Sequence, residues 1–148
     1  MEPLLKDRET IEKILEGMRR VRPYFRKLFA LTSELSDPEV VILARLAESE
    51  DGTISVKEIF EALHPINPSK LTQVTNEMEE RGLITKERDK RDRRRVNLIL
   101  TETGREAYYA LEREMARLLA RHFAKASSAE LQLLLDSFLV WEKVLGDL

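Results

Sequence analysis

Apolar residues recur every three or four positions along most of the chain, which is the spacing of one face of an α-helix. Between residues 84 and 100 the period changes to two, as it does in a strand. The pattern therefore predicts a mainly α protein with a small β-hairpin wing. The six expected helices cover Glu9–Leu35, Asp37–Ser49, Val56–Leu63, Pro68–Arg81, Glu102–Lys125 and Ala129–Leu145.

Start signals separate these helices from one another. Three starts have the capping-box spacing, in which a serine stands three residues before a glutamate: Ser36, Ser55 and Ser127. Asn67 can cap the helix that begins at Pro68, where the missing N–H of proline does no harm. Pro23 lies inside the first helical segment, and we expect it to kink that helix or to split it near residues 21–22.

The helices before the hairpin and the hairpin itself have the order of a winged helix-turn-helix. Strands are expected at Ile84–Arg88 and Arg95–Leu100, with the charged run Asp89–Arg94 at the hairpin tip. In a helix-turn-helix the second helix enters the major groove of DNA. Here that helix is Pro68–Arg81, so the sequence predicts a six-helix winged helix-turn-helix.

The predicted recognition helix has one apolar and one polar face. Leu71, Val74 and Met78 fall within about 60° of one another on a helical wheel, so we expect them to be buried. The opposite face and its flanks carry Ser69, Lys70, Thr72, Gln73, Asn76 and Glu80. Gln and Asn can make paired hydrogen bonds to adenine, and Ser and Thr can bind phosphates or base edges. The polar face can therefore read bases, although such a face is often only solvent-exposed.

Positive charge is concentrated at the hairpin. The chain has 25 basic and 27 acidic residues and a net charge of −2. Residues 86–95 include seven basic and three acidic ones, so this stretch carries +4 and the rest of the chain carries −6. A concentrated basic patch on an acidic body is typical of a site for a polyanion. The alternative is a solvated surface loop.

An arginine at the tip of a narrow ribbon can reach the minor groove, where negative potential attracts a guanidinium group. Asp92 stands two residues before Arg94, and its carboxylate can hold that guanidinium in one rotamer. We therefore predict DNA contacts from both the helix and the wing. The candidate residues are Ser69, Lys70, Thr72, Gln73, Asn76, Arg88, Lys90, Arg91, Asp92, Arg93, Arg94 and Arg95.

Aromatic residues are concentrated in the terminal helices. Only Phe60 lies between residues 37 and 101. Aromatic side chains favour interfaces, so we predict that the terminal helices form a dimer body, with an ordinary monomeric core as the alternative. An effector pocket is a further interpretation, because ligand pockets are mostly apolar. Its candidate walls are Tyr24, Phe25, Phe29 and Tyr108, which core or dimer packing explains equally well.

The stretch from Gly82 to Glu106 resembles the wing signature of the MarR family of bacterial and archaeal transcriptional regulators. In that signature Gly-Leu-Ile or Gly-Leu-Val is followed by a basic residue, Asp-Arg-Arg and then Leu-Thr-x-x-Gly. The length and the six-helix order match the family too, so the resemblance covers essentially the whole chain. The matching residues are Gly82, Leu83, Ile84, Asp92, Arg93, Arg94, Leu100, Thr101 and Gly104.

The resemblance implies a homodimer that grips a pseudo-palindromic operator. It divides the chain into an N-terminal dimerisation region at 1–36, a DNA-binding domain at 37–101 and C-terminal dimerisation helices at 102–148. It also implies that Arg94 enters the minor groove and that Asp92 orients it. Many members release DNA when a small aromatic or phenolic compound binds. The resemblance therefore implies a sequence-specific repressor, or less often an activator, that can respond to such an effector.

A winged helix that binds proteins instead of DNA is the alternative function, favoured by the net acidity and by the glutamates of the recognition helix. Catalysis and metal binding have little support. Cysteine is absent, and His64 and His122 lie on different elements, so we expect no metal, cofactor or enzyme activity. With no signal-peptide pattern and no apolar stretch of 18 residues, we expect a cytoplasmic protein with no membrane partner.

Overall fold

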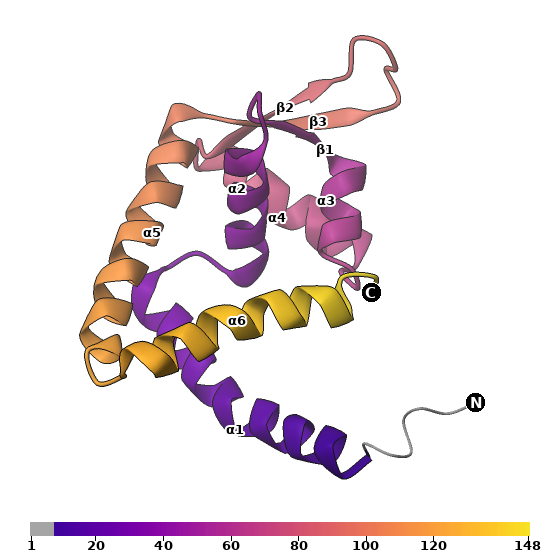
Figure 1. Ribbon diagram of the computed structural model, residues 1–148. Coiled ribbons are helices and arrows are strands. Elements are labelled where there is room, and N and C mark those ends of the chain that lie inside the picture. The colour runs from indigo at the N-terminus through magenta and orange to yellow at the C-terminus, as the bar shows by residue number, and fades with distance from the viewer. Residues whose placement is uncertain (1–7) are drawn as a thin grey trace. The chain divides into compact units, whose positions relative to one another are not determined.

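A computed structural model describes residues 8–148, which form six helices and three strands (Figure 1). The predicted mainly α fold with a hairpin wing is confirmed. The chain divides into two units, a larger one that ends at Glu112 and a smaller one from Arg113 to Leu148. The elements are α1 (Arg8–Thr32), α2 (Asp37–Glu48), β1 (Thr53–Ser55), α3 (Val56–Ala62), α4 (Pro68–Glu80), β2 (Ile84–Arg88), β3 (Val96–Leu100), α5 (Glu102–Phe123) and α6 (Ser128–Leu145).

The sequence does not predict β1, the short strand before α3. β1 pairs with one edge of β3, with Ile54 opposite Leu98, and β2 pairs with the other edge, with Lys86 opposite Leu98. Both pairings are antiparallel, so the strand order is β1-β3-β2. Three residues are too few to show an alternating pattern, and a pairing between distant segments leaves no local signal.

The hydrophobic core of the larger unit lies among the sheet, α2, α3 and α4. The buried stripe predicted for α4 is confirmed, because Leu71, Val74 and Met78 are buried. Thr75 is buried beside them and donates its hydroxyl to the Thr72 carbonyl at 3.1 Å. The core consists of Ile42, Leu43, Leu46, Ile59, Leu71, Val74, Met78, Leu83, Ile84 and Leu98.

Helix caps form at most of the predicted starts. The Ser55 hydroxyl accepts the Glu58 N–H at 3.2 Å at the start of α3. Ser127 accepts the Glu130 N–H at 3.1 Å, and the Glu130 carboxylate accepts the Ser127 N–H at 3.0 Å. Only the second of these is a complete capping box. The hydrogen bonds from Ser127 also lower the pKa of Glu130, so this cap is intact at neutral pH.

The capping box predicted at Ser36 is wrong. The Ser36 hydroxyl makes no cap hydrogen bond to the backbone of α2 and donates instead to the Glu39 carboxylate at 3.0 Å. The other oxygen of Glu39 accepts from Arg81 Nη1 at 2.7 Å. The Glu39 side chain is only 10% exposed, and a buried charge needs a partner of opposite sign. This ion pair therefore ties the start of α2 to the end of α4.

The first helix is not split at Pro23. α1 runs from Arg8 to Thr32 with Pro23 inside it, so the predicted split near residues 21–22 is wrong. A kink stays a prediction. Pro23 leaves the Arg19 carbonyl without its helical donor, and because the residues around it are exposed, water can bind that carbonyl instead.

A close approach of two backbones fixes the start of α5 to the turn after α4. Gly82 ends α4 with a φ of +74°, a left-handed conformation that favours glycine. A Cβ on Gly104 would lie 2.0 Å from the Leu83 carbonyl oxygen, so no other residue fits there. Thr101 donates its hydroxyl to that same oxygen at 2.9 Å and accepts the Gly104 N–H at 3.0 Å. The Leu-Thr-x-x-Gly motif therefore makes this junction.

The smaller unit contains the last part of α5 and all of α6. α6 is apolar around most of its circumference, yet none of its residues is buried. Its Leu139, for example, is 67% exposed. α1, in the larger unit, likewise has no buried residue and exposes its apolar stripe. Apolar helix surfaces are normally covered in a folded protein, so the exposed apolar residues of α1 and α6 are candidates for an interface. Over the same residues, no helix has the length and apolarity needed to cross a membrane.

Candidate nucleic-acid interface

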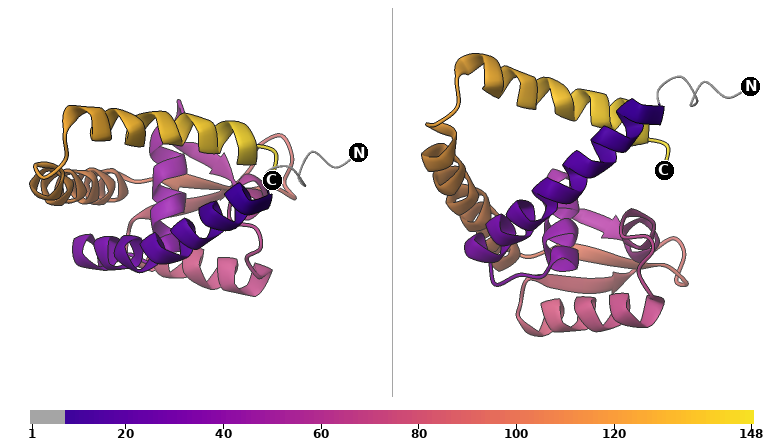
Figure 2. Two further views of the ribbon diagram at one scale, coloured as in Figure 1. Left: turned by 60° about the horizontal axis from the view of Figure 1, so that its bottom comes forward. Right: turned by 90° about the horizontal axis from the view of Figure 1, so that it is seen from below.

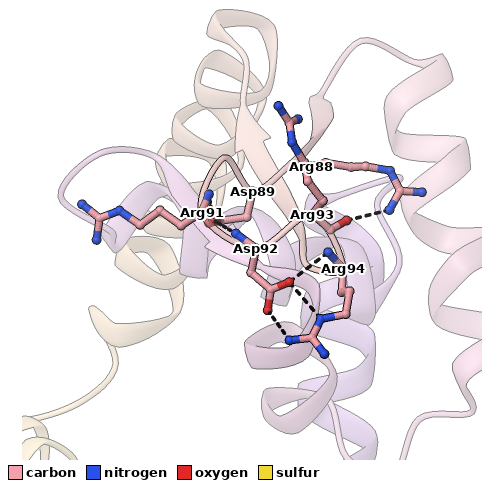
Figure 3. A network of polar contacts seen from close by, with 6 residues as sticks. All are labelled: Arg88, Asp89, Arg91, Asp92, Arg93 and Arg94. Atoms are coloured by element: carbon pink, nitrogen blue, oxygen red, sulfur yellow. Dashed lines mark hydrogen bonds and ion pairs between the residues drawn. The ribbon is translucent and has the colours of Figure 1, made fainter.

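One carboxylate, that of Asp89, orders the loop at the hairpin tip (Figure 3). Asp89 Oδ1 accepts the N–H groups of Arg91 and Asp92 at 2.8 and 3.1 Å, and Oδ2 accepts from Asn97 Nδ2 at 3.1 Å. Across the hairpin, the Asp89 N–H donates to the Arg95 carbonyl at 2.9 Å. These hydrogen bonds, that of Asn97 foremost, lower the pKa of Asp89 below its usual 3.8. The loop therefore keeps its charged anchor at neutral pH.

Asp92 and Arg94 form the ion pair that the sequence predicts (Figure 3). Arg94 Nε and Nη2 donate to Asp92 Oδ1 and Oδ2 at 3.1 and 3.3 Å, and the Arg94 N–H donates to Oδ1 at 3.1 Å. The Arg94 side chain is nevertheless 91% exposed. The guanidinium is thus held in one direction while it stays open to solvent.

The Asp92 carboxyl is ionised at neutral pH. The side-chain and backbone hydrogen bonds from Arg94 lower the pKa of Asp92 below its usual 3.8. Because the folded pKa is the lower one, the ion pair is fully formed above pH 3.8 and is lost only as the pH falls through the lowered pKa.

The remaining basic residues of the tip are exposed as well. Arg88 Nη1 donates to the Arg93 carbonyl at 2.9 Å, which joins the two sides of the loop. The hairpin projects beyond the helices of its unit, so the tip is not folded back on them (Figure 1). The structure brings together at this tip all seven wing residues predicted to contact DNA, namely Arg88, Lys90, Arg91, Asp92, Arg93, Arg94 and Arg95.

The polar face of α4 is exposed at every predicted position. Asn67 Oδ1 caps the helix by accepting the Ser69 N–H at 2.8 Å, and Pro68 follows as predicted. The Thr72 hydroxyl donates to the Pro68 carbonyl at 3.1 Å, which leaves its oxygen free to accept. The exposed residues of this face include Ser69, Lys70, Thr72, Gln73 and Asn76.

A cavity of about 490 Å³ lies between the start of α4 and the hairpin. Three cationic side chains, those of Lys57, Arg94 and Arg95, line it together with mostly apolar groups. The chain runs along α4 and returns along β2 in the opposite direction, so the tip lies at the N-terminal end of α4 (Figure 2). The other lining residues are Ser55, Val56, Phe60, Pro68, Leu71, Thr72 and Val96.

Sequence reasoning missed several residues of this surface. Asp89 had a usable signal, because aspartate often accepts the N–H two residues further on in a turn. Its partner Asn97 lies eight residues away and had no such signal. Lys57 comes from α3 and lines the cavity only because the fold brings α3 beside the wing.

The predicted effector residues lie on α1 and α5. The side chains of Tyr24, Phe25 and Phe29 are exposed. Tyr108 is partly buried against the core, where burial and the nearby Glu112 raise the pKa of its hydroxyl. None of the four lines the cavity beside α4, so a shared pocket for them stays a prediction. In the part of the chain that the structure describes, no His, Asp and Glu side chains are grouped to hold a metal ion.

Two helices joined by a turn and followed by a basic β-ribbon define a winged helix-turn-helix protein. Residues 26–111 match the family model of the transcriptional regulator SarA/Rot. The chain belongs to this family of winged-helix transcriptional regulators, which act on transcription and are not enzymes.

One curated relative and two solved structures are similar to this chain. The chain is similar to the helix-turn-helix-type transcriptional regulator YpoP of Bacillus subtilis, with 29% identity over 91% of both chains. The fold is also that of a MarR family protein from Bacillus stearothermophilus, with a TM-score of 0.79, 19% identity and coverage of 94% and 97%. NadR in complex with 4-hydroxyphenylacetate has the same fold, with a TM-score of 0.61, 23% identity and coverage of 89% and 91%.

Proposed function

We propose that this regulator is a cytoplasmic repressor that binds a pseudo-palindromic operator as a homodimer. Each protomer places α4 in a major groove and Arg94 in the neighbouring minor groove. The observation that carries this proposal is the Asp92–Arg94 pair at the hairpin tip. Arg94 Nε and Nη2 donate to the two oxygens of Asp92 at 3.1 and 3.3 Å, which holds the exposed guanidinium in one orientation. Preorganisation of this kind reduces the side-chain entropy lost when the arginine enters a groove.

The remaining surface is suited to the DNA backbone between the two grooves. The dipole at the N-terminal end of α4 favours a phosphate there. Lys57 and Arg95 supply positive charge beside an apolar floor, a combination that fits alternating phosphate and deoxyribose groups. On α4, the polar residues Ser69, Lys70, Thr72, Gln73 and Asn76 then face the bases and the nearest phosphates.

The exposed apolar helices support the dimer. α1 and α6 have no buried residue within the described chain, although both carry long apolar stripes. Burying a Leu or Phe side chain contributes about 1.5–3 kcal/mol, so a second copy that covers several of them gives a stable pair. In such a pair, residues 1–36 and 102–148 form the dimerisation regions. Residues 37–101, which lie between them in the sequence, form the DNA-binding domain.

A small phenolic effector is the regulatory part of the proposal. NadR, which has the same fold, was solved with 4-hydroxyphenylacetate bound. In this chain, Tyr24, Phe25 and Phe29 offer exposed aromatic rings on α1, and Tyr108 offers a hydroxyl on α5. Binding of a phenol to these residues would shift the protein towards a state that does not fit the operator.

Selection of bound sequences from a random DNA pool tests the proposed function. Two wings related by a two-fold axis should enrich an inverted repeat whose half-sites lie about one helical turn apart, roughly 10–10.5 base pairs or a multiple. If no sequence is enriched over the starting pool, the proposal fails and the protein-binding alternative gains support.

Replacement of Asp92 separates positioning from simple charge. Asp92→Ala removes a negative charge near DNA, and on charge alone it should strengthen binding. We expect the opposite, a loss of affinity of about two- to tenfold for each wing, because Arg94 is no longer held and its ordering on binding then costs about 0.5–1.5 kcal/mol. Fluorescence anisotropy with a labelled operator measures the change.

The matched control for this experiment is Glu87→Ala, which removes the same charge from an exposed position on the same hairpin. Glu87→Ala should leave binding unchanged or tighten it slightly. Tighter binding by both variants would mean that Asp92 acts only through its charge.

A further inference from the structure

Two amide side chains on the exposed face of α4 are each engaged by a neighbour. Gln73 Nε2 donates to Glu77 Oε1 at 3.1 Å. The ammonium group of Lys86, on β2, donates to Asn76 Oδ1. Each amide therefore has one end bound within the protein, although both residues are exposed.

The backbone places Lys86 beside α4 independently of its side chain. The Lys86 N–H donates to Glu79 Oε2 at 3.1 Å, which joins β2 to the last turns of α4. The Lys86 side chain is partly buried, unlike the exposed basic residues of the hairpin tip. Its ammonium group is thus held at Asn76 by the fold, and we infer from this that Lys86 positions Asn76.

The orientation of each amide follows from the charge of its partner. If the Asn76 amide were turned over, its NH₂ group would face the ammonium group of Lys86, donor against donor. If the Gln73 amide were turned over, its oxygen would face the Glu77 carboxylate. Hydrogen bonds to charged groups are stronger than neutral ones, so both orientations are well determined.

We propose that these contacts give the two amides opposite main roles in reading bases: Asn76 offers its NH₂ group as the donor, and Gln73 offers its oxygen as the acceptor. The proposal rests on the proposed function, in which α4 enters the major groove. It replaces the paired hydrogen bonds to adenine that the sequence alone predicts for both residues. Lys86 and Glu77 are the positioning residues.

This assignment selects different bases for the two residues. In the major groove, guanine offers acceptors at O6 and N7 and thymine offers one at O4, whereas cytosine offers only a donor at N4. Adenine has an acceptor at N7 beside its N6 donor, so a residue that only donates leaves N6 without a partner and favours adenine less. Asn76 should therefore select guanine or thymine and reject cytosine. Gln73 needs a donor, which adenine N6 and cytosine N4 supply and which guanine and thymine do not.

The test is selection from random DNA with the full-length chain and a set of variants. Asn76→Ala identifies the half-site position that Asn76 reads, because discrimination is lost there. At that position, Lys86→Met should shift the preference from guanine or thymine towards adenine by about tenfold, the effect of one good base contact. Asn76→Asp keeps a partner for Lys86 and presents an acceptor, so it should select cytosine.

Two controls separate positioning from charge and from folding. Lys90→Met removes the same charge at the exposed tip, and it should weaken binding to all sequences without changing the selected bases. Lys86→Arg keeps a donor and should retain the wild-type motif. Thermal unfolding followed by circular dichroism verifies that each variant is folded.

The outcomes distinguish this inference from the proposed function. A wild-type motif with guanine or thymine at the Asn76 position, shifted by Lys86→Met and not by Lys90→Met, supports the inference. A wild-type motif that Lys86→Met leaves unchanged, or one with adenine or cytosine at that position, overturns the inference and leaves the proposed function standing. Failure of the wild type to enrich any sequence overturns the proposed function itself.

Discussion

Replacing Arg94 with alanine should lower the affinity for the operator about a hundredfold while the protein stays folded. Each wing loses one guanidinium contact, for which about 1.4 kcal/mol, or tenfold, is a moderate value, and the dimer has two wings. The fold should be unaffected because the Arg94 side chain is 91% exposed and its one side-chain partner is Asp92 on the same loop. Anisotropy titrations with labelled operator measure the affinity, and a thermal melt measures the stability.

A suitable control is Lys125→Ala, which removes one positive charge from an exposed position after α5, far along the chain from the wing. Its affinity should stay within about twofold of the wild type, because screening limits the reach of a surface charge to about 10 Å. Equal losses for Arg94→Ala and Lys125→Ala would show that the arginine contributes only to the overall charge.

Replacing Leu139 with glutamate should break the dimer. Leu139 is 67% exposed in the single chain, so a glutamate there leaves the protomer fold intact. If the dimer interface covers α6, the substitution removes about 1.5–3 kcal/mol of favourable burial free energy from each copy. It also places an unpaired charge at the interface. A monomer binds with one wing domain instead of two, so the operator affinity should fall by a factor of about 10²–10⁴. Analytical ultracentrifugation and anisotropy measure the two effects.

Ser128→Glu provides the comparison, because it adds the same charge at an exposed position in the first turn of α6. There a carboxylate is favoured by the helix dipole, and the dimer should persist. A Leu139→Glu protein that sediments as a dimer and binds the operator normally would contradict the proposed role of α6.

Local patterns were sufficient to predict most of the fold. The two hairpin strands come from a run with period two, and the predicted Ile84–Arg88 is the observed β2. Caps at Ser55, Asn67 and Ser127 gave helix starts within one or two residues, because capping is a contact between near neighbours. The Asp92–Arg94 pair was likewise predictable, since only one residue separates its members.

Features that depend on contacts between distant residues could not be predicted. Ser36 and Glu39 have the local spacing of a capping box, but the Glu39 carboxylate instead forms an ion pair with Arg81, 42 residues further on. Lys86 looked like one more charge of a basic run until the fold placed it against Asn76 and Glu79 of α4. The direction of the Asn76 amide is therefore a property of the tertiary structure, whereas that of Gln73 depends on Glu77, four residues further on in the same helix.

The salt dependence of operator binding tests the central claim most directly. If α4 and the arginine tip of each protomer contact about six to ten phosphates per dimer, log K plotted against log salt should fall with a slope of about −5 to −9. The Arg94→Ala protein should show a shallower slope, by about one for each wing. A wild-type affinity that does not change with salt, and that Arg94→Ala leaves untouched, would contradict recognition of DNA through this wing.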